Sequence, residues 1–267
     1  KIFTLMKTIK SFFSIFNYKT IIASIISFAS SYACVHYEIK AEFPFYLISI
    51  AIVFPIVFSI DSAYKRREHA LQYYADLKGH AISLYLGIRE WGNLHDPELS
   101  LKYKKDIKEI FQLISATFMK DPKEAKKDEL EIYVRFSKLS ESLIEVKRLG
   151  VGSSEVSRLH QYVSKMIIAY GIVRNVFYYR TPITLRAYSK IFIYFFPILY
   201  GPYCAATYQD YSHGIAYVIA ILYSVLLVSL DNLQEHLENP FDQIGEDDIN
   251  FEVDELELLL LESKKKD

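Results

Sequence analysis

Apolar runs and densely charged stretches alternate along this chain in long blocks. Four runs contain no Asp, Glu, Lys or Arg, and each approaches the ~20 residues that a helix needs to cross the ~30 Å hydrocarbon core of a membrane. Charges gather at the ends of these runs, which favours membrane-spanning helices over buried helices of a large soluble protein. The four predicted spans are Thr20–Tyr37, Phe43–Ile60, Ile191–Gln209 and Tyr211–Leu230.

The first run also has features of a secretory signal. Lysines precede it, and the letters SYAC at residues 31–34 place Ala33 before a cysteine, as at a lipoprotein cleavage site. A second apolar run follows closely, however, and Ser31 stands where such a site prefers leucine. We therefore expect a retained membrane helix and leave a lipidated Cys34 open as the alternative.

Basic residues mark one side of the predicted spans. The two short connections between paired spans, residues 36–42 and 207–214, hold a single lysine, Lys40. Lys and Arg favour the cytoplasmic side of a membrane. Both hairpins are therefore expected to turn on the outside, with both termini and the middle region in the cytoplasm. The cations that set this orientation are Lys7, Lys10, Lys19, Lys65, Arg66, Arg67, Arg180, Arg186 and Lys190.

The middle of the chain, residues 62–187, is predicted to form a cytosolic bundle of helices. Apolar residues recur there at helical spacing between charged ones, and no strand pattern competes. Asp96-Pro97 marks a helix start, Asp121-Pro122 a stop, and Gly150 the end of a third helix before Ser153 opens the next. We expect this bundle to be continuous with the second and third spans.

These assignments give an all-α membrane protein in four segments. They are residues 1–61 with the first two spans, 62–187 with the cytosolic helices, 188–231 with the last two spans, and 232–267 as an acidic cytosolic tail. Acidic tails are usually solvated. In this one, Phe241, Ile249 and Phe251 predict docking on the helical body.

Composition excludes several classes of function. The formal net charge of −1 gives no excess of positive charge to bind a polyanion, so no nucleic-acid partner is expected. The two cysteines lack the spacing of a disulfide framework or a metal site. The chain has none of the short motifs of nucleotide-binding, metalloprotease or serine hydrolase sites, and its histidines are scattered. We expect no enzymatic activity and no required cofactor.

One stripe in the second predicted span suggests a pore. Ile50, Phe54 and Phe58 stand four residues apart, and each step of four turns only about 40° around a helix. If several copies of the helix surround an axis, the stripe becomes three stacked apolar rings, which can gate ions by dewetting. Pro55 would bend the helix by removing one hydrogen bond. Lipid contact or ordinary packing is the alternative for these residues.

Three segments of the chain stand out in this order: IAIVFPIVFSIDSAYKRREHA at residues 50–70, RTPITLRAYSKIFIYFFPILYGP at 180–202 and LENPFDQIGEDDINFE at 237–252. Together they resemble three segments of the bestrophin family of pentameric ion channels. These are the family's second span with the helix after it, its entry to the third span, and its NPFG stretch with the following acidic cluster. The resemblance implies a homopentamer in the lipid bilayer whose neck is lined by the stripe.

The resemblance implies two further sites. The start of the third span would form a cytosolic constriction with Ile183, Leu185 and Arg186 as candidates, although this segment is one residue longer than the family pattern. Animal members bind calcium after the NPFG stretch, whereas prokaryotic-type members, which this chain resembles in length, lack calcium gating. Asp242 replaces the glycine here, and the acids follow at longer spacing. The candidate calcium ligands are Asn239, Asp247, Asp248 and Asn250.

The function implied by the resemblance is a channel that passively conducts small anions such as chloride through a hydrophobic neck. Some bacterial members of the family favour cations, so a sodium-selective homologue is one alternative. A non-conducting membrane scaffold whose cytosolic helices bind a partner is another. A secondary transporter is disfavoured, because the sequence shows no inverted repeats and no pair of broken helices.

Overall fold

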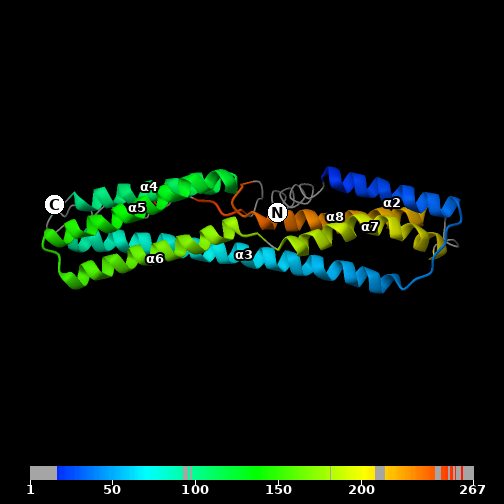
Figure 1. Ribbon diagram of the computed structural model, residues 1–267, viewed down its shortest axis with the longest axis horizontal. Helices are drawn as coiled ribbons and strands as arrows, with labels where there is room; N and C mark the ends of the chain where they lie inside the picture. The colour runs from blue at the N-terminus through cyan, green and yellow to red at the C-terminus, as the bar shows by residue number, and fades with distance from the viewer. Residues whose placement is uncertain are drawn as a thin grey trace, which may run out of the picture. The chain divides into compact units, whose positions relative to one another are not determined.

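The computed structural model describes residues 17–92, 96, 98–180, 182–207, 214–243, 248–251, 253–254, 256 and 260 of the 267-residue chain. The helices are α2 (Tyr18–His36), α3 (Phe45–Gly87), the short π-helix η1 (Ile88–Gly92), α4 (Leu99–Phe118), α5 (Pro122–Arg148), α6 (Ser153–Tyr178), α7 (Ile183–Thr207) and α8 (Ile215–Glu238) (Figure 1). No strand occurs among these described residues. The predicted all-α fold class is confirmed.

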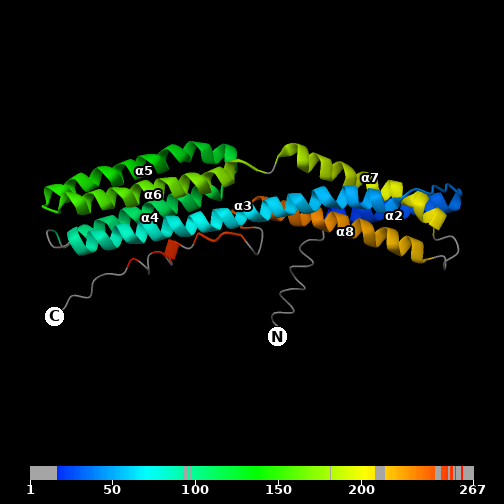
Figure 2. The same ribbon diagram turned by 90° about the horizontal axis from the view of Figure 1, so that it is seen from below.

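Contacts divide the chain into two compact units. The first unit holds the described residues up to Lys65 together with Arg180–Glu238, and the second holds Arg66–Tyr179 with the described residues from Asn239 onward. Helix α3 contributes to both units and is one unbroken ribbon (Figure 2). The predicted continuity of the second span with the charged helices is therefore confirmed.

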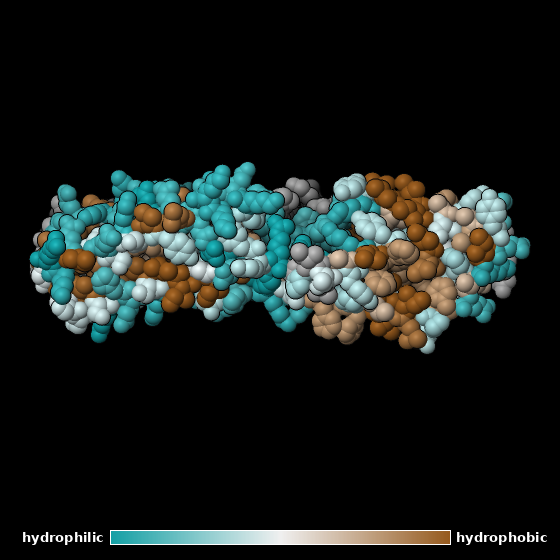
Figure 3. Space-filling view, viewed as in Figure 1, coloured by the Kyte–Doolittle hydropathy of each residue, from teal (hydrophilic) through white to brown (hydrophobic). Residues whose placement is uncertain are grey.

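The first unit is apolar both inside and outside. Its helices α2, α7 and α8 and the first part of α3 enclose a core, and apolar residues also gather on its surface (Figure 3). Among the described residues, three helices are long and apolar enough to cross a membrane, namely α2, α3 and α8. The chain is therefore a membrane protein. The predicted third span lies in α7, which continues through Pro197 and Pro202.

Small residues bring α2 close to α7 and α8. Gly201 of α7 approaches Ser30 of α2 so closely that a Cβ on the glycine would lie 2.9 Å from the Ser30 carbonyl oxygen. The Ser30 hydroxyl donates to the Ile198 carbonyl (3.0 Å), and the Ser27 hydroxyl donates to the Ala220 carbonyl of α8 (2.9 Å). Close packing and hydrogen bonds of this kind hold helices together in lipid, where apolar burial supplies no driving force.

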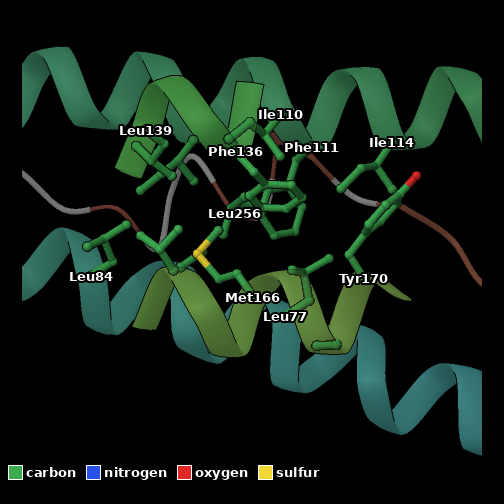
Figure 4. Packing of buried hydrophobic residues seen from close by; sticks show 14 of the residues in the cluster. Leu77, Leu84, Ile110, Phe111, Ile114, Phe136, Leu139, Met166, Tyr170 and Leu256 are labelled. Carbon is green, nitrogen blue, oxygen red and sulfur yellow. The ribbon is translucent and has the colours of Figure 1, made fainter. Parts of the chain in front are cut away.

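The second unit is a bundle of the charged helices. The rest of α3, together with α4, α5, α6 and part of the tail, surrounds one continuous apolar core. Figure 4 shows residues from each of these elements meeting there: Leu77, Leu84, Ile110, Phe111, Ile114, Phe136, Leu139, Met166, Tyr170 and Leu256. Burial in this core raises the pKa of the Tyr170 hydroxyl, so this side chain stays neutral.

Short polar signals set the helix ends, with one correction. Asp121 caps α5, because its side chain accepts a hydrogen bond from the Lys123 N–H (2.9 Å). The expected start of α4 at Asp96 was too early, since the helix begins at Leu99. The Asp96 side chain instead accepts from the Glu98 N–H (3.0 Å), and so it orders the turn that precedes the helix.

The expected continuity of the bundle with the third span is wrong. Helix α6 ends at Tyr178, Tyr179 is extended (φ −102°, ψ 104°), and α7 begins only at Ile183. Pro182 accounts for the break, because proline lacks an N–H and helices usually end before a proline.

Beyond α8, the acidic tail docks on the second unit. Phe241, Ile249 and Phe251 are at most 5% exposed and belong to the core of that unit. The Ile249 N–H donates to the Pro240 carbonyl (2.7 Å). Gln243 takes a left-handed backbone conformation (φ 59°), and its amide donates to the Ile249 carbonyl (2.9 Å). The docking predicted from the apolar residues of the tail is confirmed.

Replacing Phe241 by alanine should destabilise the second unit. The buried ring lies 5.2 Å from the Phe118 ring and 5.9 Å from the Phe177 ring, between centroids. Loss of such a ring from a core costs about 3–5 kcal/mol, so the Tm of the purified protein should fall by several degrees. The control is Tyr179→Ala at an exposed ring, which should change the free energy of unfolding by less than about 0.5 kcal/mol. Equal effects of the two substitutions would contradict the docking.

Gly201→Ala should loosen the packing of α2 on α7. The added methyl group meets the Ser30 backbone, which cannot rotate away, so we expect a loss of about 1–3 kcal/mol, measured by thermal unfolding in detergent. Gly79→Ala in α3 is the control, because nothing lies within 4 Å of a Cβ placed there. That substitution should be neutral or stabilise by about 0.5–1 kcal/mol. A Gly201→Ala protein as stable as its parent would refute the close approach.

Candidate functional site

The stripe predicted in the second span lies on the exposed face of α3 in the first unit. Ile50, Phe54 and Phe58 are 58%, 60% and 54% exposed. The opposite face of the helix is buried, and it consists of Ile52, Ile56, Ser59 and Ala63. Three large apolar side chains therefore point away from the core of their own unit, along about 12 Å of helix.

The two aromatic rings of the stripe pack against each other. The Phe54 and Phe58 centroids are 4.8 Å apart with an interplanar angle of 80°, an edge-to-face arrangement. Pro55 stands between them, yet α3 remains helical on both sides of it. The stripe is thus a continuous apolar surface, broken by no polar side chain between Ile50 and Phe58.

Other helices of the first unit also expose apolar residues. Examples are Ile21, Ile25, Phe28, Tyr32, Tyr188, Tyr194, Phe195, Val218, Leu222 and Tyr223. These faces include tyrosines, which are typical of membrane interfaces. The α3 stripe between Ile50 and Phe58 contains no tyrosine. The exposure of the stripe in the single chain is compatible with contact with lipid and also with lining a pore axis shared by several chains.

Charges begin on the same face of α3 directly after the stripe. The Lys65 ammonium donates to the Asp61 carboxylate (2.7 Å), one turn apart on the helix. Both side chains are exposed, at 73% for Lys65 and 49% for Asp61. The apolar stripe thus ends in an ion pair.

The next two cations of α3 are held by the second unit. Arg66 donates to the carbonyl of Val176 (2.7 Å) and to that of Tyr179, at the end of α6. Arg67 pairs with Glu68 (2.5 Å). The Arg66 contacts therefore tie α3 to the end of α6, whereas the Arg67 pair lies within α3.

The candidates for a lower constriction stand at the start of α7. The side chains of Ile183 and Leu185 lie outside the described part of the structure. Arg186 donates to the buried Glu238 carboxylate of α8 (3.1 Å), which offsets its charge within the chain. This pairing therefore argues against a ring of uncompensated positive charge at Arg186.

A second ion-pair group ties α7 and α2 to α8. Glu235 accepts from Lys190 (2.8 Å) and from Lys19 (2.5 Å). Sequence reasoning used these lysines as orientation signals and missed their partner. The signal that identifies it is the spacing of Asp231, Glu235 and Glu238, which places three acids on one face of α8.

The candidate calcium ligands are only partly placed. Asp247 lies outside the described residues. The Asn239 amide donates to the Asp242 carboxylate (2.8 Å). Asp248 and Asn250 flank the buried Ile249, and they are half-buried and exposed, respectively. Within the described part of the chain, no three His, Cys, Asp or Glu residues gather as a metal site would require.

Comparison with known proteins identifies the fold. No protein-family model matches the chain, and no curated protein does either. Among solved structures, a bacterial bestrophin homologue from Klebsiella pneumoniae carrying a point mutation matches with a TM-score of 0.74 at 16% identity, covering 91% of this chain and 97% of the other. The same bacterial homologue solved by zinc phasing gives a TM-score of 0.68 at 15% identity, over 91% and 96%. A structure described only as a membrane protein reaches 0.75 at 16% identity.

The similarity extends over nearly the whole length of both chains. The protein therefore has the fold of the bacterial bestrophin homologues. This agrees with the resemblance carried by the three sequence motifs, although the sequences have diverged almost completely.

Cysteine labelling separates a water-lined stripe from a lipid-facing one. Phe54→Cys should react with a membrane-impermeant thiol reagent if the stripe lines a pore. The control is Leu222→Cys on α8, which is 54% exposed in the single chain but should stay unreactive if lipid covers it. The two native cysteines, Cys34 and Cys204, are buried and should add little background. An unreactive Phe54→Cys together with a reactive Leu222→Cys would contradict both assignments, that of the stripe to a pore and that of Leu222 to lipid.

Proposed function

We propose that this protein is a bestrophin-like ion channel that passively conducts small anions such as chloride. In this proposal five copies surround an axis, and the second spans line a hydrophobic neck with Ile50, Phe54 and Phe58. The single observation that carries it is the exposed apolar stripe on α3 in a chain with the bestrophin-homologue fold. Such rings control passage by their hydration.

The proposal includes four spans, with α7 as the third in sequence. Its apolar core residues Ile193, Phe196 and Tyr200 pack with α2 and α8, which supports placing it in the membrane beside them. Both termini and the charged bundle would lie in the cytoplasm, since the cations of the chain flank that side of the spans.

The stripe itself does not set the sign of the ion. Aromatic edges carry partial positive charge, which supports anion conduction through rings of Phe54 and Phe58. A sodium-selective homologue is the alternative within the same architecture. The lower constriction, with Ile183, Leu185 and Arg186, would add a second narrow point whose charge is offset by Glu238.

Calcium is a separate proposal, and conduction does not depend on it. Asp248 and Asn250 would offer hard oxygen ligands on the side of the tail opposite the buried Ile249. The Asn239 amide would have to turn from Asp242 to join them. A bound ion would fix the tail segment that follows α8.

A non-conducting scaffold is the alternative from another class. The bundle of charged helices favours it, since a bundle of this size can bind a partner while the spans only anchor it. A monomeric particle in detergent would support the scaffold, because rings require several copies.

Reversal potentials of the purified protein in planar bilayers test the proposed function. Under a sodium chloride gradient, the reversal potential should shift toward the chloride equilibrium potential. Replacing Ile50, Phe54 and Phe58 together by alanine should raise the conductance, because wider and less apolar rings stay wet. The control is the triple change of Ile21, Ile25 and Leu222 to alanine, at exposed positions of α2 and α8. Silence of an intact oligomer would favour the scaffold, and unchanged currents in the first triple variant would refute the neck.

A further inference from the structure

We propose that the two charges of the Asp61–Lys65 ion pair act in opposite directions on which sign of ion the pore admits. The inference rests on the proposed channel. It gives the pair the role of discriminating between anions and cations, which the uncharged neck cannot fill. In it, Asp61 disfavours anions at the inner end of the neck, and Lys65 offsets Asp61. The balance between the two sets the permeability ratio of chloride to sodium.

The position of the pair on α3 is the first argument. Both side chains lie on the exposed face that carries Phe54 and Phe58. Counting from Phe58, the helix turns by about 60° to Asp61 and by about 20° to Lys65, measured as the smaller angle. Whatever faces the stripe therefore also meets these two charges. If the stripe lines a pore, the pair lies in it.

The order of the two charges is the second argument. Asp61 is about 4–5 Å along the helix from Phe58, and Lys65 about 10 Å. Copies around an axis would present a ring of carboxylates next to the last apolar ring and a ring of ammonium groups one turn beyond. Carboxylate rings favour cations and ammonium rings favour anions. Walls of low dielectric constant focus such fields on the ion path.

The third argument is that the neighbouring cations are engaged elsewhere. Arg66 donates to two carbonyls at the end of α6. Arg67 pairs with Glu68 at 2.5 Å. The 2.7 Å contact between Lys65 and Asp61 stays on the exposed face of α3. This pair is thus the first charge that an ion meets on leaving the stripe.

The test is the chloride-to-sodium permeability ratio of charge-neutralised variants in planar bilayers. Asp61→Asn should raise the ratio and Lys65→Gln should lower it, each by about two- to fivefold, the range that a water-screened exposed charge supports. The double variant should return close to the parent. The shifts should shrink in concentrated salt, because the Debye length falls from about 10 Å at 0.1 M to about 3 Å at 1 M.

A matched ion pair in the second unit provides the control. Lys102 and Glu145 are 2.6 Å apart and similarly exposed, at 49% and 55%, but they join α4 to α5. Lys102→Gln should leave the permeability ratio unchanged. Each variant is compared by its oligomer peak in size-exclusion chromatography, so that a lost assembly is recognised as such.

The outcomes separate this inference from the proposed channel. A parent protein that assembles but carries no current would refute the channel itself. A conducting parent with unchanged ratios in both single variants would overturn the role of the pair and leave the channel intact. Shifts in the same direction for both substitutions, or shifts that persist in concentrated salt, would also overturn it.

Discussion

The two opposite faces of α3 are the constraint on which this structure depends. Ile52 and Ile56 must be buried against the other helices of the first unit, and that fixes Phe54 and Phe58 on the outside. A helix cannot turn one set inward without turning the other outward. The same helix continues past Lys65 into the second unit, where Leu77 and Leu84 are buried. The sequence of one helix thus decides the core of two units and the composition of an exposed apolar surface.

Most of the fold could be predicted because its signals are local. Runs without charge give the apolar helices, and Asp121-Pro122 marks where the preceding helix, α4, must stop. The errors arose where local signals compete. Asp96 accepts a hydrogen bond within a turn instead of at the helix start. The break before α7 follows from Pro182, whose effect was underestimated because apolar and helical residues continue on both sides of it.

Less of the candidate site could be predicted, because it depends on partners far apart in the chain. The spacing of Ile50, Phe54 and Phe58 predicts their common face, and the structure places all three on it. Nothing near Arg186 in sequence indicates that Glu238 will pair with it. The docked tail lies between these cases. Its buried phenylalanines could be foreseen from hydrophobicity in an acidic context, while the left-handed turn at Gln243 could not.

The polar contacts near the end of α8 bear on how the protein is made. Asn17 donates to Asn232 (2.9 Å) and Lys19 to Glu235 (2.5 Å), across 215 and 216 residues of sequence. At about 5–20 residues per second, ribosomes need roughly 10–40 s to reach these partners. Until α7 and α8 have been made, α2 lacks both of the helices that it packs against, and Lys19 lacks its partner Glu235. The first of these helices to leave the ribosome is among the last to reach its final place, so the nascent chain offers a window in which a chaperone or insertase can act.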